Sequence, residues 1–85
     1  MIDFDFVNWK PHIERHIEDN GLSTEEVEDI LYDPAARRTT STRPPFRPAV
    51  FGCTTTGKRI IVVFDEFKDG GYVIIEPVTA YEVND

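Results

Sequence analysis

The sequence lacks several features that define specialised classes of protein. It has one cysteine, Cys53, among 85 residues, which excludes an internal disulfide and a cysteine-rich zinc site. Its longest apolar run, Ile60–Phe64, is far shorter than the roughly 20 residues that span a bilayer. The first six residues include two aspartates and no basic residue, unlike a secretory signal peptide. We therefore expect a cytoplasmic protein that makes no contact with a membrane.

A local absence of acids divides the chain by charge. The net charge is −7, which argues against a general nucleic-acid binder. No Asp or Glu lies between Arg37 and Arg59, so the other three basic residues and all sixteen acids give the rest of the chain a charge of −13. The acid-free segment contains six basic residues: Arg37, Arg38, Arg43, Arg47, Lys58 and Arg59. This basic segment has two interpretations. In the first, it binds RNA or another anionic ligand, or a protein partner. In the second, it pairs with the acidic remainder inside the fold.

The length predicts a single domain over residues 1–85. A hydrophobic content of 40% and a charged content of 29% are typical of a globular protein. A chain of this size buries only about 60–65% of its unfolded surface. A partner protein or a second copy in a homo-oligomer would therefore add stability.

Two helices are predicted in the first part of the chain. The first begins near Asn8 as N-cap and ends at Gly21, with Trp9 on its buried face. The second has a clearer start, because Ser23 and Glu26 form the spacing of a capping box. It ends before Pro34, since the residue that precedes a proline is disfavoured in the helical conformation.

Three strands are predicted in the second part, over residues 49–54, 59–67 and 72–78. Short glycine-containing links join them, so consecutive strands should pair antiparallel. Residues 35–45 form either a mobile loop or a short edge strand followed by a loop, because Pro44 and Pro45 exclude a central strand. The predicted class is α+β: two N-terminal helices packed on an antiparallel sheet of three to four strands, with residues 60–64 central.

Several motifs have simpler structural explanations. Residues 52–59 nearly fit a phosphate-binding loop, but they lead into a strand where such a loop needs a helix. His12 and His16 have helical metal-ligand spacing without a third ligand, so we expect no metal and no cofactor. His16 is either a hydrogen-bonded core residue or a general acid or base acting on RNA. Asp65 and Glu66 are neighbours on a strand and point to opposite faces, which excludes an acid–base pair.

The order of several short motifs resembles the BrnT-like branch of the RelE superfamily, and the resemblance covers nearly the whole chain. The residues that carry it are Trp9-x-x-His12-Ile13-x-x-His16, Gly21-Leu22-Ser23-x-Glu25-Glu26-Val27-Glu28, Asp33-Pro34, Gly52-x-Thr54-x-x-Gly57-Lys58-Arg59, Val62-Val63-Phe64 and Pro77-Val78-Thr79-Ala80. Members of this family are small toxins of type II toxin–antitoxin systems. The resemblance therefore implies a ribonuclease fold, ribonuclease activity without a metal, and an antitoxin partner.

The chain departs from the family pattern where cationic groups are expected. Family members usually carry an arginine directly after the Thr-Ala of the last strand, where this chain has Tyr81. Their basic C-terminal helix has no counterpart after Ala80, and residues are added between His16 and Gly21. RelE-type cleavage needs positive groups that stabilise charge on the scissile phosphate. These departures predict weak or lost cleavage.

Three functions remain open from the sequence. The first is a toxin-like protein with weak or lost ribonuclease activity that acts through a protein partner. The second is an active ribonuclease that holds RNA, alone or on the ribosome, with the basic segment. Its catalytic candidates are His16, Arg47 and Tyr81. The third is a small homo-oligomeric structural module.

Overall fold

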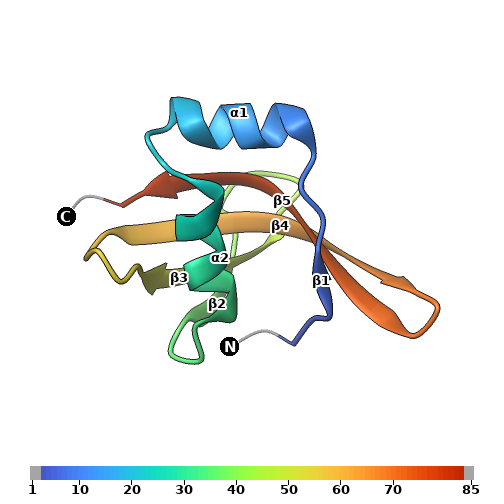
Figure 1. The fold of residues 1–85 in the computed structure, drawn as a ribbon. Helices are drawn as coiled ribbons and strands as arrows, with labels where there is room; N and C mark the ends of the chain where they lie inside the picture. Colours follow the sequence, from blue (N-terminus) through green and yellow to red (C-terminus); the bar gives the residue numbers. More distant parts are fainter. Residues whose placement is uncertain (1–2, 84–85) are drawn as a thin grey trace.

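The computed structural model describes residues 3–83 as an α+β fold with two helices and one five-stranded sheet. The elements in chain order are β1 (Phe6–Val7), α1 (Pro11–Asp19), α2 (Thr24–Tyr32), β2 (Arg37–Thr40), β3 (Pro48–Cys53), β4 (Arg59–Asp69) and β5 (Tyr72–Glu82). The strands are ordered β1-β5-β4-β3-β2 across the sheet (Figure 1). Neither helix in residues 3–83 combines the length and hydrophobicity needed to cross a membrane.

The predicted fold class is confirmed, but the predicted sheet is wrong in two respects. The sheet has five strands rather than three or four, and it is mixed because β1 runs parallel to β5. The helices lie between β1 and β2 in the chain, so they do not begin it. A strand of only two residues, Phe6–Val7, has no alternating pattern, and its position depends on pairing with the distant residues 74 and 75.

The centre of the sheet agrees with the sequence prediction. β4 is the third of five strands, and Ile60, Val62 and Phe64 are fully buried. Its hairpin to β5 turns at Gly70 and Gly71, both with positive φ, as a two-residue type I′ turn requires. β5 runs to Glu82 rather than ending at Val78 as predicted. Its pairing with β4 shifts register between Val63 and Phe64 and then continues to the end of the strand.

Helix α2 begins as the sequence predicts. The Ser23 hydroxyl accepts a hydrogen bond from the Glu26 N–H at 3.1 Å, and the Glu26 carboxylate accepts one from the Ser23 N–H at 3.1 Å. The two bonds complete a capping box and satisfy N–H groups that a helix start leaves without partners. The helix ends at Tyr32, with Asp33 extended before Pro34.

Helix α1 begins later than predicted. Its N-cap is Lys10, not Asn8, and Pro11 occupies the first turn. The Asn8 side chain cannot cap this helix because it donates to Glu76 of β5 at 2.6 Å. The helix ends at the predicted place: Asn20 is the C-cap and Gly21 follows with a φ of +80°.

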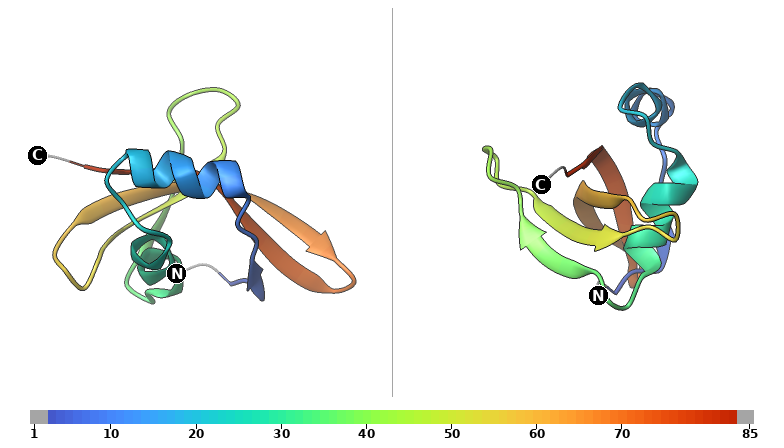
Figure 2. Two further views of the ribbon diagram at one scale, coloured as in Figure 1. Left: turned by 45° about the horizontal axis from the view of Figure 1, so that its top comes forward. Right: turned by 90° about the vertical axis from the view of Figure 1, so that its left-hand side faces the viewer.

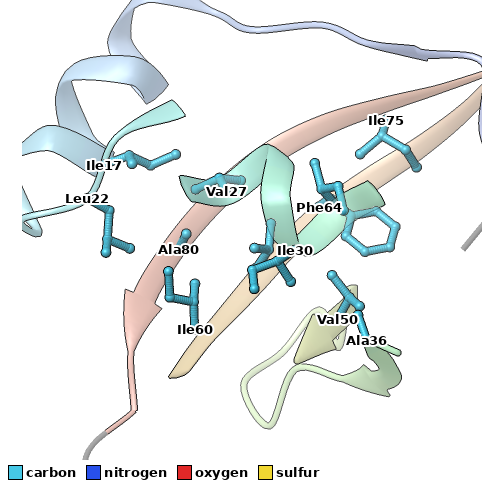
Figure 3. Close-up of a cluster of buried hydrophobic side chains, with 12 residues drawn as sticks. Ile17, Leu22, Val27, Ile30, Ala36, Val50, Ile60, Phe64, Ile75 and Ala80 are labelled. Carbon is cyan, nitrogen blue, oxygen red and sulfur yellow. The ribbon is translucent and has the colours of Figure 1, made fainter. Parts of the chain in front are cut away.

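One hydrophobic cluster joins α2 to the sheet (Figure 3). Its members come from both helices, from strands β3, β4 and β5, and from the links just before α2 and β2. They are Ile17, Leu22, Val27, Ile30, Leu31, Ala36, Val50, Ile60, Val62, Phe64, Ile75 and Ala80. Phe4, Val7, Trp9 and Ile13 pack against it, partly buried. Because Val50, Val62 and Ala80 share one register row, the cluster lies on one face of the sheet. The opposite face carries the residues between them, including Ala49, Val63 and Thr79.

Helix α1 lies along the part of β5 that β1 leaves unpaired. β1 pairs only with residues 74 and 75, whereas α1 runs beside the C-terminal half of β5 (Figure 1). The Asn20 side chain donates to the Ala80 carbonyl oxygen at 2.9 Å. The helix thus covers an edge whose backbone groups would otherwise be exposed.

Residues 35–45 are a short edge strand followed by a loop, which was one of the two predicted alternatives. β2 pairs antiparallel with β3 and ends at Thr40. The loop then closes through a hydrogen bond from the Ser41 N–H to the Arg47 carbonyl oxygen at 2.8 Å. It projects from the face of the sheet opposite α2 (Figure 2).

Candidate functional site

A cavity of about 610 Å³ is lined by residues of α1 and its C-cap, β5, Val63 of β4 and the 41–47 loop. We call it the arginine cavity, and its lining residues are His16, Asn20, Ser41, Thr42, Arg43, Pro44, Pro45, Arg47, Val63, Val78, Thr79 and Tyr81. The three catalytic candidates from the sequence, His16, Arg47 and Tyr81, therefore lie around one cavity.

The 41–47 loop brings two arginines to this cavity. Its ends are held by the Ser41–Arg47 backbone bond, and its tip by a bond from the Phe46 N–H to the Arg43 carbonyl oxygen at 2.8 Å. Phe46 has a φ of +57°, an uncommon conformation for a residue other than glycine. Arg43 is exposed and makes no ion pair with any residue between 3 and 83. Its guanidinium can donate to an anionic ligand.

Arg47 differs from Arg43 because it already has a carboxylate partner. Its Nε donates to Oδ1 of Asp65 on β4 at 2.9 Å, and both side chains are 37% exposed. The prediction that Asp65 and Glu66 point to opposite faces is confirmed, since Glu66 instead lies 3.5 Å from Arg38. The positive charge of Arg47 is therefore partly compensated within the protein.

His16 lies at the rim of the cavity rather than in the core. It is exposed, and its Nε2 lies 2.8 Å from the Thr79 hydroxyl oxygen. The alternative of a hydrogen-bonded core histidine is wrong, because Ile17 takes the buried position on this turn of α1. An exposed imidazole bound to a hydroxyl is able to exchange a proton with a bound ligand.

Tyr81 occupies the end of β5 that follows Thr79 on the same face. It is 45% exposed, and its pairing partner on β4 is Ile61. The phenol can donate or accept one hydrogen bond but carries no positive charge at neutral pH. It gives the cavity a polar wall without a third cation.

The six residues of the basic segment do not form one patch. Only Arg43 and Arg47 line the arginine cavity. Lys58 lies 3.0 Å from Glu26 on α2, and Arg38 bridges to Glu66. Arg37 lines a separate hollow with Asp33 and Phe51, and Arg59 also has interaction partners. The acidic remainder therefore pairs with at least three of the six, as the second interpretation of the charge pattern expects.

The pairing of Lys58 with Glu26 has an electrostatic consequence. The hydrogen-bonded Lys58 ammonium holds the pKa of the Glu26 carboxyl below its usual range. Burial opposes this shift, and hydrogen bonds from Ser23 reinforce it. Lys58 thus stabilises the start of α2 rather than a bound ligand.

Several cavity residues were not identified from the sequence. Asn20, Ser41, Thr42 and Thr79 carry hydroxyl or amide groups into the arginine cavity. Of these, only Thr79 could have been inferred from the sequence. Tyr81 was already a candidate, and residues two apart on a strand share a face. Ser41 and Thr42 depend on the loop conformation, which has no sequence signature.

Within residues 3–83, no three His, Cys, Asp or Glu side chains come together as they would to hold a metal ion. His12 and His16 are therefore not joined there by a third ligand. Neither the protein-family models nor the curated proteins contain a match to this chain.

Proposed function

We propose that this chain is a toxin-like protein of a type II toxin–antitoxin system. It binds a phosphate of single-stranded RNA in the arginine cavity, cleaves RNA weakly or not at all, and acts through a protein partner. The observation that carries this proposal is the meeting of His16, Arg43, Arg47 and Tyr81 around one cavity.

Binding of a phosphate is supported by the donors that line the cavity. Arg43 has no ion pair among the described residues, and Ser41 and Thr42 add hydroxyl groups beside it. A guanidinium presents several donors in a plane that matches phosphate oxygens. Because the protein as a whole is acidic, the rest of its surface should have low affinity for RNA. Binding is therefore expected only at this locally basic site.

Weak cleavage is supported by the same geometry. A ribonuclease of this kind must neutralise charge that develops on the phosphate in the transition state. Arg47 shares its charge with Asp65 at 2.9 Å, and Tyr81 is uncharged where the resembled family has arginine. Arg43 is thus the one cavity arginine without a carboxylate partner among residues 3–83.

The binding test compares two arginines that differ in position. Affinity for a labelled single-stranded RNA is measured against salt for the wild type, Arg43→Ala and the control Arg37→Ala. Arg43→Ala should weaken binding and lower the slope of log affinity against log salt by about 0.7, the value for one phosphate contact on a single strand. Arg37→Ala removes the same charge outside the cavity and should change the slope little. Equal effects of the two variants would contradict the cavity as the RNA site.

An active ribonuclease is the second candidate, and the convergence of His16, Arg47 and Tyr81 favours it. A cleavage assay on single-stranded RNA and on translating ribosomes separates the two. We expect little cleavage by the wild type and a gain of activity in Tyr81→Arg, which restores the missing cation. Robust wild-type cleavage that Arg47→Ala abolishes would establish the second candidate. Absence of both cleavage and salt-dependent binding would favour a structural module.

A further inference from the structure

A second surface lies on the same face of the sheet as the arginine cavity, at the other end. It is a hollow of about 450 Å³ lined by residues of β1, β4 and β5. Figure 2 shows β1 beside the projecting β4–β5 hairpin. Phe6, Phe67 and Ile74 line the hollow, and the Tyr72 ring lies 5.3 Å from the Phe6 ring. We call these four residues the aromatic patch.

The aromatic rings of the patch are only half covered by the rest of the chain. Phe6, Phe67 and Tyr72 are 53%, 47% and 54% exposed, and they come from three different strands. β4 alternates regularly after the shift at Val63/Phe64, so Phe67 points away from the hydrophobic cluster under α2. Contiguous exposed aromatics on a small domain are typical of an interaction site.

Carboxylates surround the aromatic patch. Asp69 lines the hollow and makes no ion pair with any residue between 3 and 83. Glu76 also lines it, with Lys10 at 3.4 Å and the Asn8 amide at 2.6 Å. The Asp5 carboxylate accepts from the Val73 N–H at 2.8 Å. The rim therefore carries net negative charge.

We infer that the aromatic patch docks a segment of a different protein that combines apolar side chains with lysine or arginine. Charge complementarity selects this partner. An apolar side chain fills the hollow, while a cation pairs with Asp69. The inference deepens the proposed function, on which it rests, because it assigns the protein partner to a surface separate from the RNA site.

Two other occupants fit the surface less well. RNA bases can stack on aromatic rings, but their phosphates would approach Asp69 and Glu76 against like charge. A two-fold dimer through this face would bring two acidic rims together, which is unfavourable for the same reason.

The test uses labelled synthetic peptides. The inference specifies which side chains the partner carries, so peptides with those side chains can stand in for it. An alternating leucine–lysine peptide is compared with leucine–glutamate and serine–lysine peptides of equal length. The leucine–lysine peptide should bind at least about tenfold more tightly than either, since only it supplies both apolar contacts and cations. Its largest amide chemical-shift changes should fall on residues 67–74.

Matched variants then locate the binding. Phe67→Ser should weaken the leucine–lysine peptide about tenfold, and Asp69→Asn should weaken it by a smaller factor. As controls on α2, Tyr32→Ser removes another exposed aromatic ring (Tyr32 is 61% exposed) and Asp29→Asn removes another carboxylate. Both should leave the affinity unchanged. Thermal melts of each variant confirm that it remains folded.

Three outcomes would overturn the inference. Equal losses in Phe67→Ser and Tyr32→Ser would mean non-specific binding. A wild-type dimer that Phe67→Ser dissociates in sedimentation would make a second copy the occupant. Loss of RNA binding in Phe67→Ser would make it an RNA surface. Failure of the proposed RNA site is distinguished from failure of this inference by Arg43→Ala. That variant should alter RNA binding but leave peptide binding unchanged.

Discussion

The Nε of Arg47 donates to the Asp65 carboxylate across 2.9 Å, joining the end of the 41–47 loop to the central strand. Asp65 lies between the arginine cavity and the aromatic patch, because Val63, Asp65 and Phe67 alternate onto one face of β4. This carboxylate positions one arginine of the cavity and at the same time reduces its charge.

Removal of this carboxylate should strengthen RNA binding. Asp65→Asn frees the Arg47 guanidinium, and we expect about two- to fivefold tighter binding, the range for an exposed ion pair. The control Glu66→Gln removes the neighbouring carboxylate on the opposite face, where it pairs with Arg38 at 3.5 Å. Titration of both variants with labelled RNA at one salt concentration measures the effect. A gain of the same size in the control would indicate a general charge effect.

The start of α2 should depend on its N-cap. Ser23→Ala removes the acceptor of the Glu26 N–H, so the free energy of unfolding should fall by about 1 kcal/mol. Ser23→Asp retains an acceptor and should cost less than about 0.5 kcal/mol. Denaturant melts provide the comparison, and equal stabilities of Ser23→Ala and Ser23→Asp would contradict a role for the capping bond.

Stability should depend on pH through Glu26. Lys58 lowers the pKa of Glu26 in the folded protein, so the carboxylate stabilises the fold above its unfolded pKa of about 4.3. This contribution is lost as the pH falls through the folded pKa. Glu26→Gln should therefore be less stable than the wild type at neutral pH, and the difference should shrink in acid. A difference independent of pH would rule this out, and Lys58→Met should raise the pKa of Glu26 in an NMR titration.

A side chain at Gly52 of β3 would press against α2 and against the residue before β2. A Cβ there would lie 3.3 Å from both the Ala36 Cβ and the Ile30 Cδ1. Gly52→Val should lower the free energy of unfolding by about 1–3 kcal/mol because it overpacks this contact. Cys53→Val, at the exposed next position, should change it by less than about 0.5 kcal/mol. Thermal or denaturant melts decide, and an unchanged Gly52→Val would show that α2 can move.

The sequence predicted the elements whose signals are local. The capping box at Ser23, the stop before Pro34 and the buried run of β4 each involve residues close in the chain. β1 and the late start of α1 could not be predicted, because both depend on β5. Phe6–Val7 forms a strand only beside residues 74 and 75, and Asn8 is recruited by Glu76 rather than by the helix.

The candidate site was predicted only as separate residues. His16, Arg47 and Tyr81 are brought together by the position of α1 along β5 and by the closure of the 41–47 loop. Both are long-range arrangements without a sequence signature. The basic segment misled for the opposite reason. Its six residues are close in the chain, but β2, the 41–47 loop and the start of β4 carry them to different surfaces.

Trp9 packs against the hydrophobic cluster just before α1, and its Nε1 is buried without a hydrogen-bond partner among residues 3–83. It is the single tryptophan of the chain, so its fluorescence arises from one known environment. An indole held in an apolar setting emits at shorter wavelength than one in water. The chain therefore contains its own optical reporter of the contact between the α1 entry and the core, and a ligand that displaces α1 should shift the emission to the red without any added label.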